Sequence, residues 1–212
     1  MLEVRNIQFG YTASPILRDV SFVVSPGETV SVIGSNGCGK TTLMRLLSTL
    51  LVPSSGQVMF EGKDIFTDPL RFRRQLGVLP ERVALYEDMS VKEYLKYRAY
   101  FKGENVKRIR RRVSEAMSLV KLDAIAQRTI ANLSYGQKKR VAFADAILLR
   151  PRVLLLDDFL AGLDQDMRDE MGEILKEVAA FSSVVVTGHE LEDMRKWSSR
   201  FLRLKEGTVK VA

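Results

Sequence analysis

Gly34-Ser35-Asn36-Gly37-Cys38-Gly39-Lys40-Thr41-Thr42 fits the P-loop (Walker A) pattern G-x-x-x-x-G-K-[ST]. Glycines in such a loop let consecutive backbone N–H groups point into one concavity, which side chains would otherwise block. Lys40 is placed to reach the β- and γ-phosphates of a nucleotide, and the Thr41 hydroxyl is placed to bind Mg²⁺. These residues therefore predict a phosphate site, and a Gly-rich turn with an incidental lysine is the alternative.

The segments on either side of this loop favour the phosphate site. Thr29–Ile33 has the apolar character of a short buried strand, and Thr41–Thr49 is typical of a helix. A phosphate on the loop would then lie at a helix N-terminus, where unpaired N–H groups and the helix dipole attract an anion.

Composition and length are those of a soluble globular protein. The chain has 212 residues, of which 46% are hydrophobic and 28% charged. Its apolar runs, such as Val153–Leu156 and Val184–Val186, have the length of strands and not of membrane spans. Met1–Arg5 does not begin a secretory signal. The one cysteine, Cys38, allows no internal disulfide, so a reducing compartment is expected.

The net charge of +7 permits several partners, namely nucleic acid, anionic lipid or acidic proteins. The densest basic cluster is Lys107–Arg112. A solvated helix face explains this cluster equally well, because no aromatic residues interleave with its charges.

Strands and helices alternate along most of the chain. Strands are expected at Leu2–Phe9, Asp19–Val24, Thr29–Ile33, Gln57–Phe60, Leu76–Leu79, Val153–Asp157 and Val184–Thr187, with a hairpin at Phe201–Val211. Helices are expected after the capping box Ser90-x-x-Glu93, over 109–120, from near Ser134, and over 167–178. This order predicts an α/β fold with a mixed, mainly parallel sheet flanked by helices. Residues 1–81 and 151–212 would form one α/β core, and the mainly helical residues 82–150 would form an inserted subdomain.

Asp157 ends the apolar run Val153–Leu156. A carboxylate at the C-terminal end of a buried strand can hold the Mg²⁺ that bridges two phosphates, as in a Walker B motif. An acid at a strand end is common, so Asp157 indicates a metal site only in combination with the P-loop.

Leu133-Ser134-Tyr135-Gly136-Gln137 is similar to the LSGGQ signature of the nucleotide-binding domains of ABC transporters. The resemblance extends over essentially the whole chain, with the motifs in the family's order, and Tyr135 departs from the usual glycine. It implies a P-loop ATPase core with an antiparallel N-terminal β region. It also implies that Ser134, Tyr135, Gly136 and Gln137 bind ATP held by a second ATPase subunit. A helix start at Ser134 suits a phosphate, and Ser134 with Gln137 would cap that helix in either case.

Asp157–Asp164 resembles the family's D-E-P-T-x-G-L-D segment. Asp164 then corresponds to the aspartate that crosses to the partner subunit and helps to form the ATP site. Asp158 stands where the family's catalytic glutamate polarises the attacking water. Because aspartate is shorter by about 1.5 Å, we expect slow hydrolysis. The alternative is that Asp158 only caps the segment that follows it.

Three further site residues follow from the resemblance. His189, the only histidine, corresponds to the switch histidine that bonds the γ-phosphate. Glu81 lies at the Q-loop position, where glutamine is commoner, and its carboxylate could reach Mg²⁺ or its water. Tyr11 matches the aromatic residue that stacks on adenine, although a turn tyrosine packed on the core is the alternative.

The sequence therefore predicts an ATP- and Mg²⁺-dependent ATPase subunit that dimerises around two ATP and drives a separate membrane-spanning subunit. Its place would be peripheral, on the cytoplasmic face of the membrane. Residues 79–95 look most like the exporters of drugs, polysaccharides and gliding-motility components, so export is expected. Two alternatives remain at this point: an ATP-gated module with little hydrolysis, and an ABC protein acting on nucleic acid or ribosomes. Nucleic acid is the less expected partner, because the chain has neither a second cassette nor a coiled-coil insertion.

Overall fold

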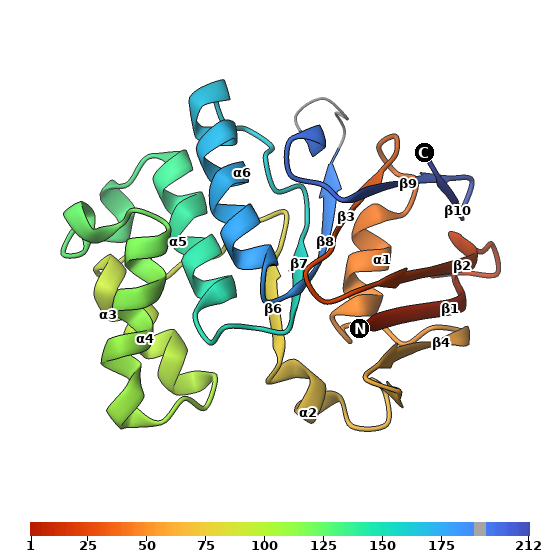
Figure 1. Ribbon diagram of the computed structural model, residues 1–212, viewed down its shortest axis with the longest axis horizontal. Coiled ribbons are helices and arrows are strands. Elements are labelled where there is room, and N and C mark those ends of the chain that lie inside the picture. Colours follow the sequence, from red (N-terminus) through yellow and green to blue (C-terminus); the bar gives the residue numbers. More distant parts are fainter. Residues whose placement is uncertain (189–193) are drawn as a thin grey trace.

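A mixed sheet of six strands carries the P-loop. The computed structural model describes residues 1–188 and 194–212, and within them this sheet has the order β10-β9-β3-β8-β7-β6 (Figure 1). Its strands are β3 (Thr29–Ile33), β6 (Leu76–Leu79), β7 (Val153–Leu156), β8 (Ser183–Gly188), β9 (Arg200–Lys205) and β10 (Thr208–Val211). From β9 to β6 the described neighbours pair in parallel, and β10 pairs antiparallel with β9. The predicted mainly parallel sheet and the C-terminal hairpin are therefore confirmed.

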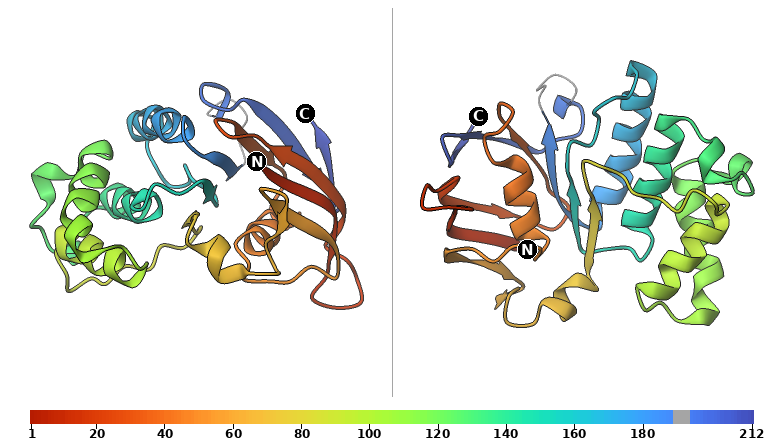
Figure 2. Two further views of the ribbon diagram at one scale, coloured as in Figure 1. Left: turned by 60° about the horizontal axis from the view of Figure 1, so that its bottom comes forward. Right: turned by 180° about the vertical axis from the view of Figure 1, so that it is seen from behind.

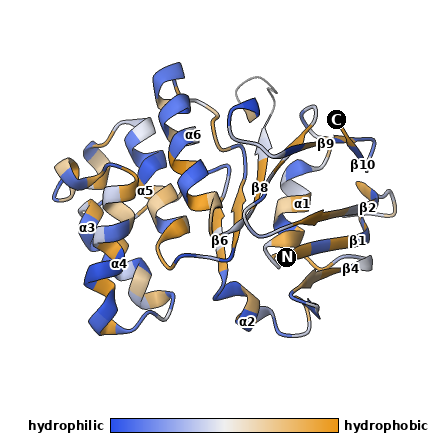
Figure 3. Ribbon diagram, viewed as in Figure 1, coloured by the Kyte–Doolittle hydropathy of each residue, from blue (hydrophilic) through white to orange (hydrophobic). Residues whose placement is uncertain are grey.

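The central strands of this sheet are apolar because both of their faces are covered. Every residue of β3, β7 and β8 is buried, which is the pattern expected of parallel strands between two layers. Figure 3 shows β6 and β8 as hydrophobic ribbon, whereas α3 and α4 carry long hydrophilic stretches.

A second, antiparallel sheet forms the N-terminal β region. Its order is β2-β1-β4-β5, with strands β1 (Leu2–Phe9), β2 (Leu17–Val24), β4 (Ser55–Phe60) and β5 (Lys63–Asp64). Strand β2 begins at Leu17, two residues before the predicted Asp19. The register of β1 and β2 shifts here and Asp19 has φ +53°, so the strand continues through a bulge that hides its alternation from sequence reading.

The helices are placed between and beside the two sheets. They are α1 (Lys40–Leu47), α2 (Pro69–Arg73), α3 (Val91–Phe101), α4 (Val106–Leu119), α5 (Tyr135–Ile147) and α6 (Gln165–Ala179), with short 3₁₀ turns at Asp123–Ile125 and Ile130–Asn132. Helix α1 lies between the sheets, and α3, α4 and α5 gather at the end of the molecule opposite the antiparallel sheet, as both views of Figure 2 show. No described helix has the length and apolar character that crossing a membrane requires.

Side-chain capping fixes where the longer helices begin. Ser90 with Glu93 and Ser134 with Gln137 form reciprocal capping boxes at α3 and α5, as the sequence predicted. Helix α1 is shorter than predicted, at Lys40–Leu47, and the main chain leaves the helical conformation at Thr49, where φ is +60°.

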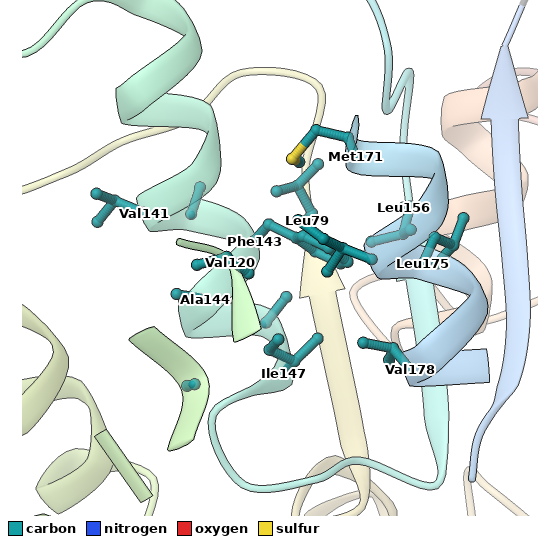
Figure 4. Packing of buried hydrophobic residues seen from close by; sticks show 14 of the residues in the cluster. Leu79, Val120, Val141, Phe143, Ala144, Ile147, Leu156, Met171, Leu175 and Val178 are labelled. Carbon is teal, nitrogen blue, oxygen red and sulfur yellow. The ribbon is translucent and has the colours of Figure 1, made fainter. Parts of the chain in front are cut away.

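Two hydrophobic clusters fill the faces of the parallel sheet. One joins α1 to both sheets, and the other packs α3, α4, α5 and α6 against β6, β7 and β8. Figure 4 shows the second cluster, in which Phe143 of α5 and Leu175 of α6 meet near Leu79 and Leu156. Because this cluster continues from the sheet into residues 82–150, packing alone does not separate a helical subdomain, and that division remains a prediction.

A partly buried ion cluster joins α3 to α5. The Asp145 carboxylate of α5 lies 3.0 Å from Nε of Arg98 and 2.8 Å from Nζ of Lys102, and its side chain is only 11% exposed. Burial lowers the pKa of Lys102, and the neighbouring Asp145 carboxylate opposes that shift. The Arg98 and Lys102 side chains are partly buried, at 35% and 26% exposed, and the carboxylate offsets the desolvation that they incur.

We predict that Asp145→Ala lowers the free energy of unfolding by about 3 kcal/mol, because it leaves two partly buried cations unpaired. Urea denaturation followed by circular dichroism measures the change. Glu173→Ala, which removes an exposed partner of Lys176, is the control and should cost less than about 0.5 kcal/mol. Equal effects of the two substitutions would contradict the prediction.

Candidate functional site

The P-loop joins the end of β3 to the start of α1, and its backbone needs glycine at two positions, one for lack of space and one for its φ angle. A Cβ on Gly34 would lie 2.5 Å from the carbonyl oxygen of Leu204 and 2.6 Å from Sγ of Cys38. Gly39, the residue before α1, has φ +109°, a conformation that favours glycine strongly. The loop therefore presents main-chain groups and not side chains toward any ligand.

Lys40 places its ammonium over this loop. Its Nζ donates to the carbonyl oxygens of Gly34 at 2.7 Å and Ser35 at 3.0 Å, and the residue is 8% exposed. The charge is thus held beside the amide groups of the loop, where an anion would bind.

Asp157, at the C-terminal end of β7, is the buried acid of the site. It accepts a hydrogen bond from the Thr187 hydroxyl of β8 at 2.6 Å, and it also bonds to the Thr41 side chain. Burial raises the pKa of Asp157, and the hydrogen bonds from Thr187 and Thr41 oppose the rise. A divalent cation at this carboxylate would favour its charged form.

Mg²⁺ fits the donor set that these residues offer. The Thr41 hydroxyl and the Asp157 carboxylate are hard oxygen ligands of the kind that Mg²⁺ prefers. Within the described ranges there is no group of three or more His, Cys, Asp or Glu side chains that could hold a metal. The cation would therefore depend on phosphate and water oxygens as well.

A cavity of 320 Å³ brings most of the predicted P-loop residues together with three acids, whereas Gly34, Ser35 and Cys38 are not part of its lining. It is lined by Ile16, Asn36, Gly37, Gly39, Lys40, Thr41, Thr42, Glu81, Asp157, Asp158 and Thr187. Asp158 is half-buried here, and its amide donates to the Thr187 hydroxyl at 2.9 Å. The wall thus combines one ammonium, two hydroxyls from α1 and three carboxyl groups, which suits a metal–phosphate ligand.

One predicted residue lies beside the P-loop, and another lies within it. Tyr11 is 54% exposed, and its ring meets Phe9 edge-on with 5.0 Å between the ring centroids. A hydrogen bond with the Thr42 side chain lowers its pKa, so Tyr11 lies beside the loop with an exposed ring of the kind that can stack on a base. Cys38 is half-buried and packs on the cluster around α1.

The signature residues lie apart from this cavity. Among the described residues that line it, none belongs to Ser134–Gln137, and Asp164 does not line it either. Ser134 and Tyr135 are exposed at the start of α5, and Asp164 caps α6 by accepting from the amide of Met167 at 2.9 Å. Within a single chain these residues do not complete the phosphate site. His189 lies outside the described residues.

Sequence reasoning missed two polar residues that the structure places at this site. Thr187 joins Asp157 to the main chain of Asp158, and its signal was one hydroxyl placed between the run Val184–Val186 and Gly188. Lys139 of α5 reaches the carbonyl oxygens of the segment after Asp157. In the sequence, Lys139 is noticeable only as a single cation on the apolar side of a predicted helix. That position does not reveal which groups the ammonium contacts.

Comparison with known proteins gives consistent results. The family model described as ABC transporter matches residues 17–161. The spermidine/putrescine import ATP-binding protein PotA of Mesoplasma florum is 33% identical over 99% of this chain and 60% of that protein. PotA of Legionella pneumophila subsp. pneumophila is 35% identical over 99% of this chain and 58% of that protein. The chain therefore spans about three fifths of the curated relatives it matches.

Solved structures agree with the fold over nearly the whole chain. An ATP-binding subunit of an ABC transporter has a TM-score of 0.88 at 31% identity, covering 99% of this chain and 88% of the other. A dimeric bacterial ABC transporter cassette has a TM-score of 0.87 at 25% identity, covering 99% and 97%. The PotA relatives are import proteins, so the comparisons do not support the exporter branch that the sequence suggested.

We predict that Thr187→Val lowers Mg²⁺-dependent nucleotide hydrolysis about tenfold or more. The substitution keeps the volume but removes the group that donates to Asp157 and accepts from the Asp158 amide. Thr187→Ser keeps the hydroxyl and is expected to stay close to the wild-type rate. A steady-state phosphate-release assay compares the three proteins, and wild-type turnover by the valine variant would contradict the assignment.

Proposed function

Since the chain belongs to the ABC transporter family, as an ATP-binding subunit, we propose that it hydrolyses ATP to drive a separate membrane-spanning subunit from the cytoplasmic face. The observation that carries the proposal is that Lys40, Asp157 and Asp158 line one cavity together with Gly37 and Gly39 of the P-loop. These groups supply a phosphate cradle, a metal-binding acid and a second acid within one space.

Each residue has a distinct task in this proposal. The P-loop amides and Lys40 hold the β- and γ-phosphates, while Tyr11 stacks on the adenine. Thr41 and Asp157 hold Mg²⁺, which neutralises charge on the phosphates when it is bound. Glu81, exposed on the cavity wall, is the proposed contact to a water of that ion.

Asp158 is the proposed group that orients the attacking water and accepts its proton. Its amide is fixed by Thr187, and the next side chain, Phe159, is fully buried, so the main chain cannot easily move the carboxylate forward. The Asp158 carboxylate therefore reaches about 1.5 Å less far from the main chain than a glutamate carboxylate would. The shorter side chain supports slow hydrolysis. It is also the observation that favours the second candidate function, an ATP-gated module with little turnover.

A second copy of the ATPase subunit is proposed to complete each ATP site. Ser134 and Tyr135 stand exposed at a helix N-terminus but do not line the cavity of their own chain, so this helix start is proposed to meet a phosphate held by the other copy. The dimeric cassette among the solved relatives has a fold close to that of this chain, which supports an arrangement in which Ser134–Gln137 and Asp164 face a partner.

Import is the direction that the relatives favour. Two PotA proteins that match 99% of this chain carry import in their names, whereas export rested only on the likeness of residues 79–95. We therefore propose uptake in place of export. The membrane-spanning subunit is expected to select the transported compound, because the residues described above recognise nucleotide and metal only.

An aromatic surface is the proposed contact with the membrane subunit. We define it as Tyr86, Tyr97, Tyr100 and Phe101. The ring of Tyr97 lies 5.4 Å from that of Tyr86 and 4.4 Å from that of Phe101, between centroids. Tyr86 is 51% and Phe101 65% exposed, so these rings are not needed to fill the core. Exposed contiguous aromatic residues are typical of protein interfaces.

We predict that Asp158→Glu raises the rate of ATP hydrolysis, because the added methylene carries the carboxylate toward the attacking water. Asp158→Asn should lower the rate about a hundredfold or more while leaving ATP affinity within about twofold. Single-turnover hydrolysis and equilibrium nucleotide binding measure the two effects. Hydrolysis by the asparagine variant at the wild-type rate would support the low-turnover module and reject Asp158 as the base.

We predict that Tyr86→Glu abolishes co-purification with the membrane subunit, because docking would bury an unpaired carboxylate in the aromatic surface. ATP affinity should be unchanged, since the phosphate cavity is formed by other elements. Leu70→Glu, which introduces the same charge at a 69% exposed position of α2, should retain the partner. Retention of the partner by both variants would reject this surface as the docking site.

A further inference from the structure

Lys139 is a charged residue buried where the sequence pattern of α5 calls for an apolar one. It is 1% exposed, and it is among the largest fully buried side chains in the described part of the chain. Placing a cation at such a depth is costly unless polar groups surround it. Burial lowers the pKa of Lys139, and the charges of Asp158 and Glu81 oppose that shift. The groups that bond to this ammonium should therefore show why a lysine is buried at this position.

The partners of Lys139 are main-chain carbonyl groups of the segment after Asp157. Nζ donates to the carbonyl oxygen of Asp158 at 2.9 Å and to that of Ala161 at 3.0 Å. The amide of Ala161 also donates to the Asp158 carbonyl, at 3.2 Å. One ammonium thus holds the two ends of a tight turn, which we call the 158–162 turn.

This turn has an unusual backbone at both of its ends. Asp158 has φ +50° and Gly162 has φ +74°. A non-glycine residue in the left-handed region costs about 1–2 kcal/mol, and such a conformation persists only where the surroundings fix it. The surroundings here are Thr187 at the Asp158 amide and Lys139 at the Asp158 carbonyl.

The start of α5 also covers the turn from outside. The ring of Tyr135 lies against Gly162, where an added Cβ would come within 2.8 Å of it, and its hydroxyl is 3.4 Å from the Ala161 carbonyl. The Lys139 ammonium lies 5.9 Å from the centroid of the same ring. The residue that departs from the family's glycine therefore contributes to the shielding of the ammonium.

We propose that Lys139 is a positioning residue for ATP hydrolysis, which fixes the 158–162 turn so that the Asp158 carboxylate faces the phosphate cavity. It also ties this turn to the first turns of α5, so the helix that begins at Ser134 and the proposed base move as one unit. The inference rests on the proposed function, because it takes Asp158 as the group that acts on water.

Lys139→Met tests the proposal, because methionine fills a similar space without a charge or a donor. Lys138→Met is the matched control, since Lys138 pairs with the exposed Glu87 at 2.6 Å and not with the turn. We expect Lys139→Met to lower kcat about tenfold to a hundredfold while KM and ATP affinity stay within about twofold. The control should keep the wild-type kcat. A raised KM with unchanged kcat, or unchanged kinetics, would overturn the proposal.

A double-variant comparison separates positioning from general destabilisation. Combined with Asp158→Asn, Lys139→Met should cause little further loss of kcat, because the group that it positions has already been replaced. A loss of the same factor in both backgrounds would show a merely structural role and overturn the proposal. If the methionine variant does not fold, Lys139→Gln takes its place in both comparisons, with a smaller loss of kcat expected because its amide can still donate.

Hydrogen exchange tests the role of Lys139 independently of whether the protein hydrolyses ATP. Failure of the proposed function would appear as wild-type protein that binds ATP but shows no Mg²⁺-dependent hydrolysis. In either case, Lys139→Met should speed exchange of the Ala161 amide at least about tenfold without changing exchange in α6. Unchanged exchange at Ala161 would show that Lys139 does not hold the turn.

Discussion

The parallel pairing of β3 with β8, and of β8 with β7, is the constraint on which the rest of this molecule depends. Parallel strands end at a common edge, so the P-loop after β3, Thr187 near the end of β8 and Asp157 after β7 meet there although they are distant in sequence. The pairing requires strands that are apolar on both faces, because helices must cover each side. The same apolar runs that build the core thus determine where the polar residues are brought together.

At this edge of the sheet, two lysine side chains are held by hydrogen bonds to main-chain carbonyl groups. Lys40 and Lys139 each donate to two carbonyl oxygens, one pair in the P-loop and the other in the 158–162 turn. A buried ammonium that donates to carbonyl groups restricts the motion of that loop. Each hydrogen bond fixes a carbonyl oxygen that would otherwise need a water molecule as its donor. The two lysines therefore define the shapes of the loops on either side of the cavity, and glycine is required where these loops approach their neighbours.

Helix α5 connects the site to the helical part of the molecule. Its first turn carries the signature residues, Lys139 reaches the turn after β7, and Asp145 holds Arg98 and Lys102 at α3. The proposed aromatic surface includes Tyr97, Tyr100 and Phe101 of α3, so α5 is the helix that connects that surface to the proposed base. Because α5 is packed by one continuous hydrophobic cluster, it is expected to move as a rigid element, which would give the partner subunit a physical path to the site.

By itself, the sequence determined the features that are local along the chain. The P-loop between a strand and a helix, the caps at Ser90 and Ser134, and Asp157 at a strand end could all be predicted, because each depends on residues within a few positions of one another. Only the tertiary structure decided which distant groups share the site, as with the hydroxyl of Thr187 and the carboxylate of Asp157, or Lys139 and the turn at Asp158. It also decided that β2 passes through a bulge at Asp19 and so begins earlier than predicted. These contacts follow from strand order and helix packing, and neither leaves a periodic signal in the residues concerned.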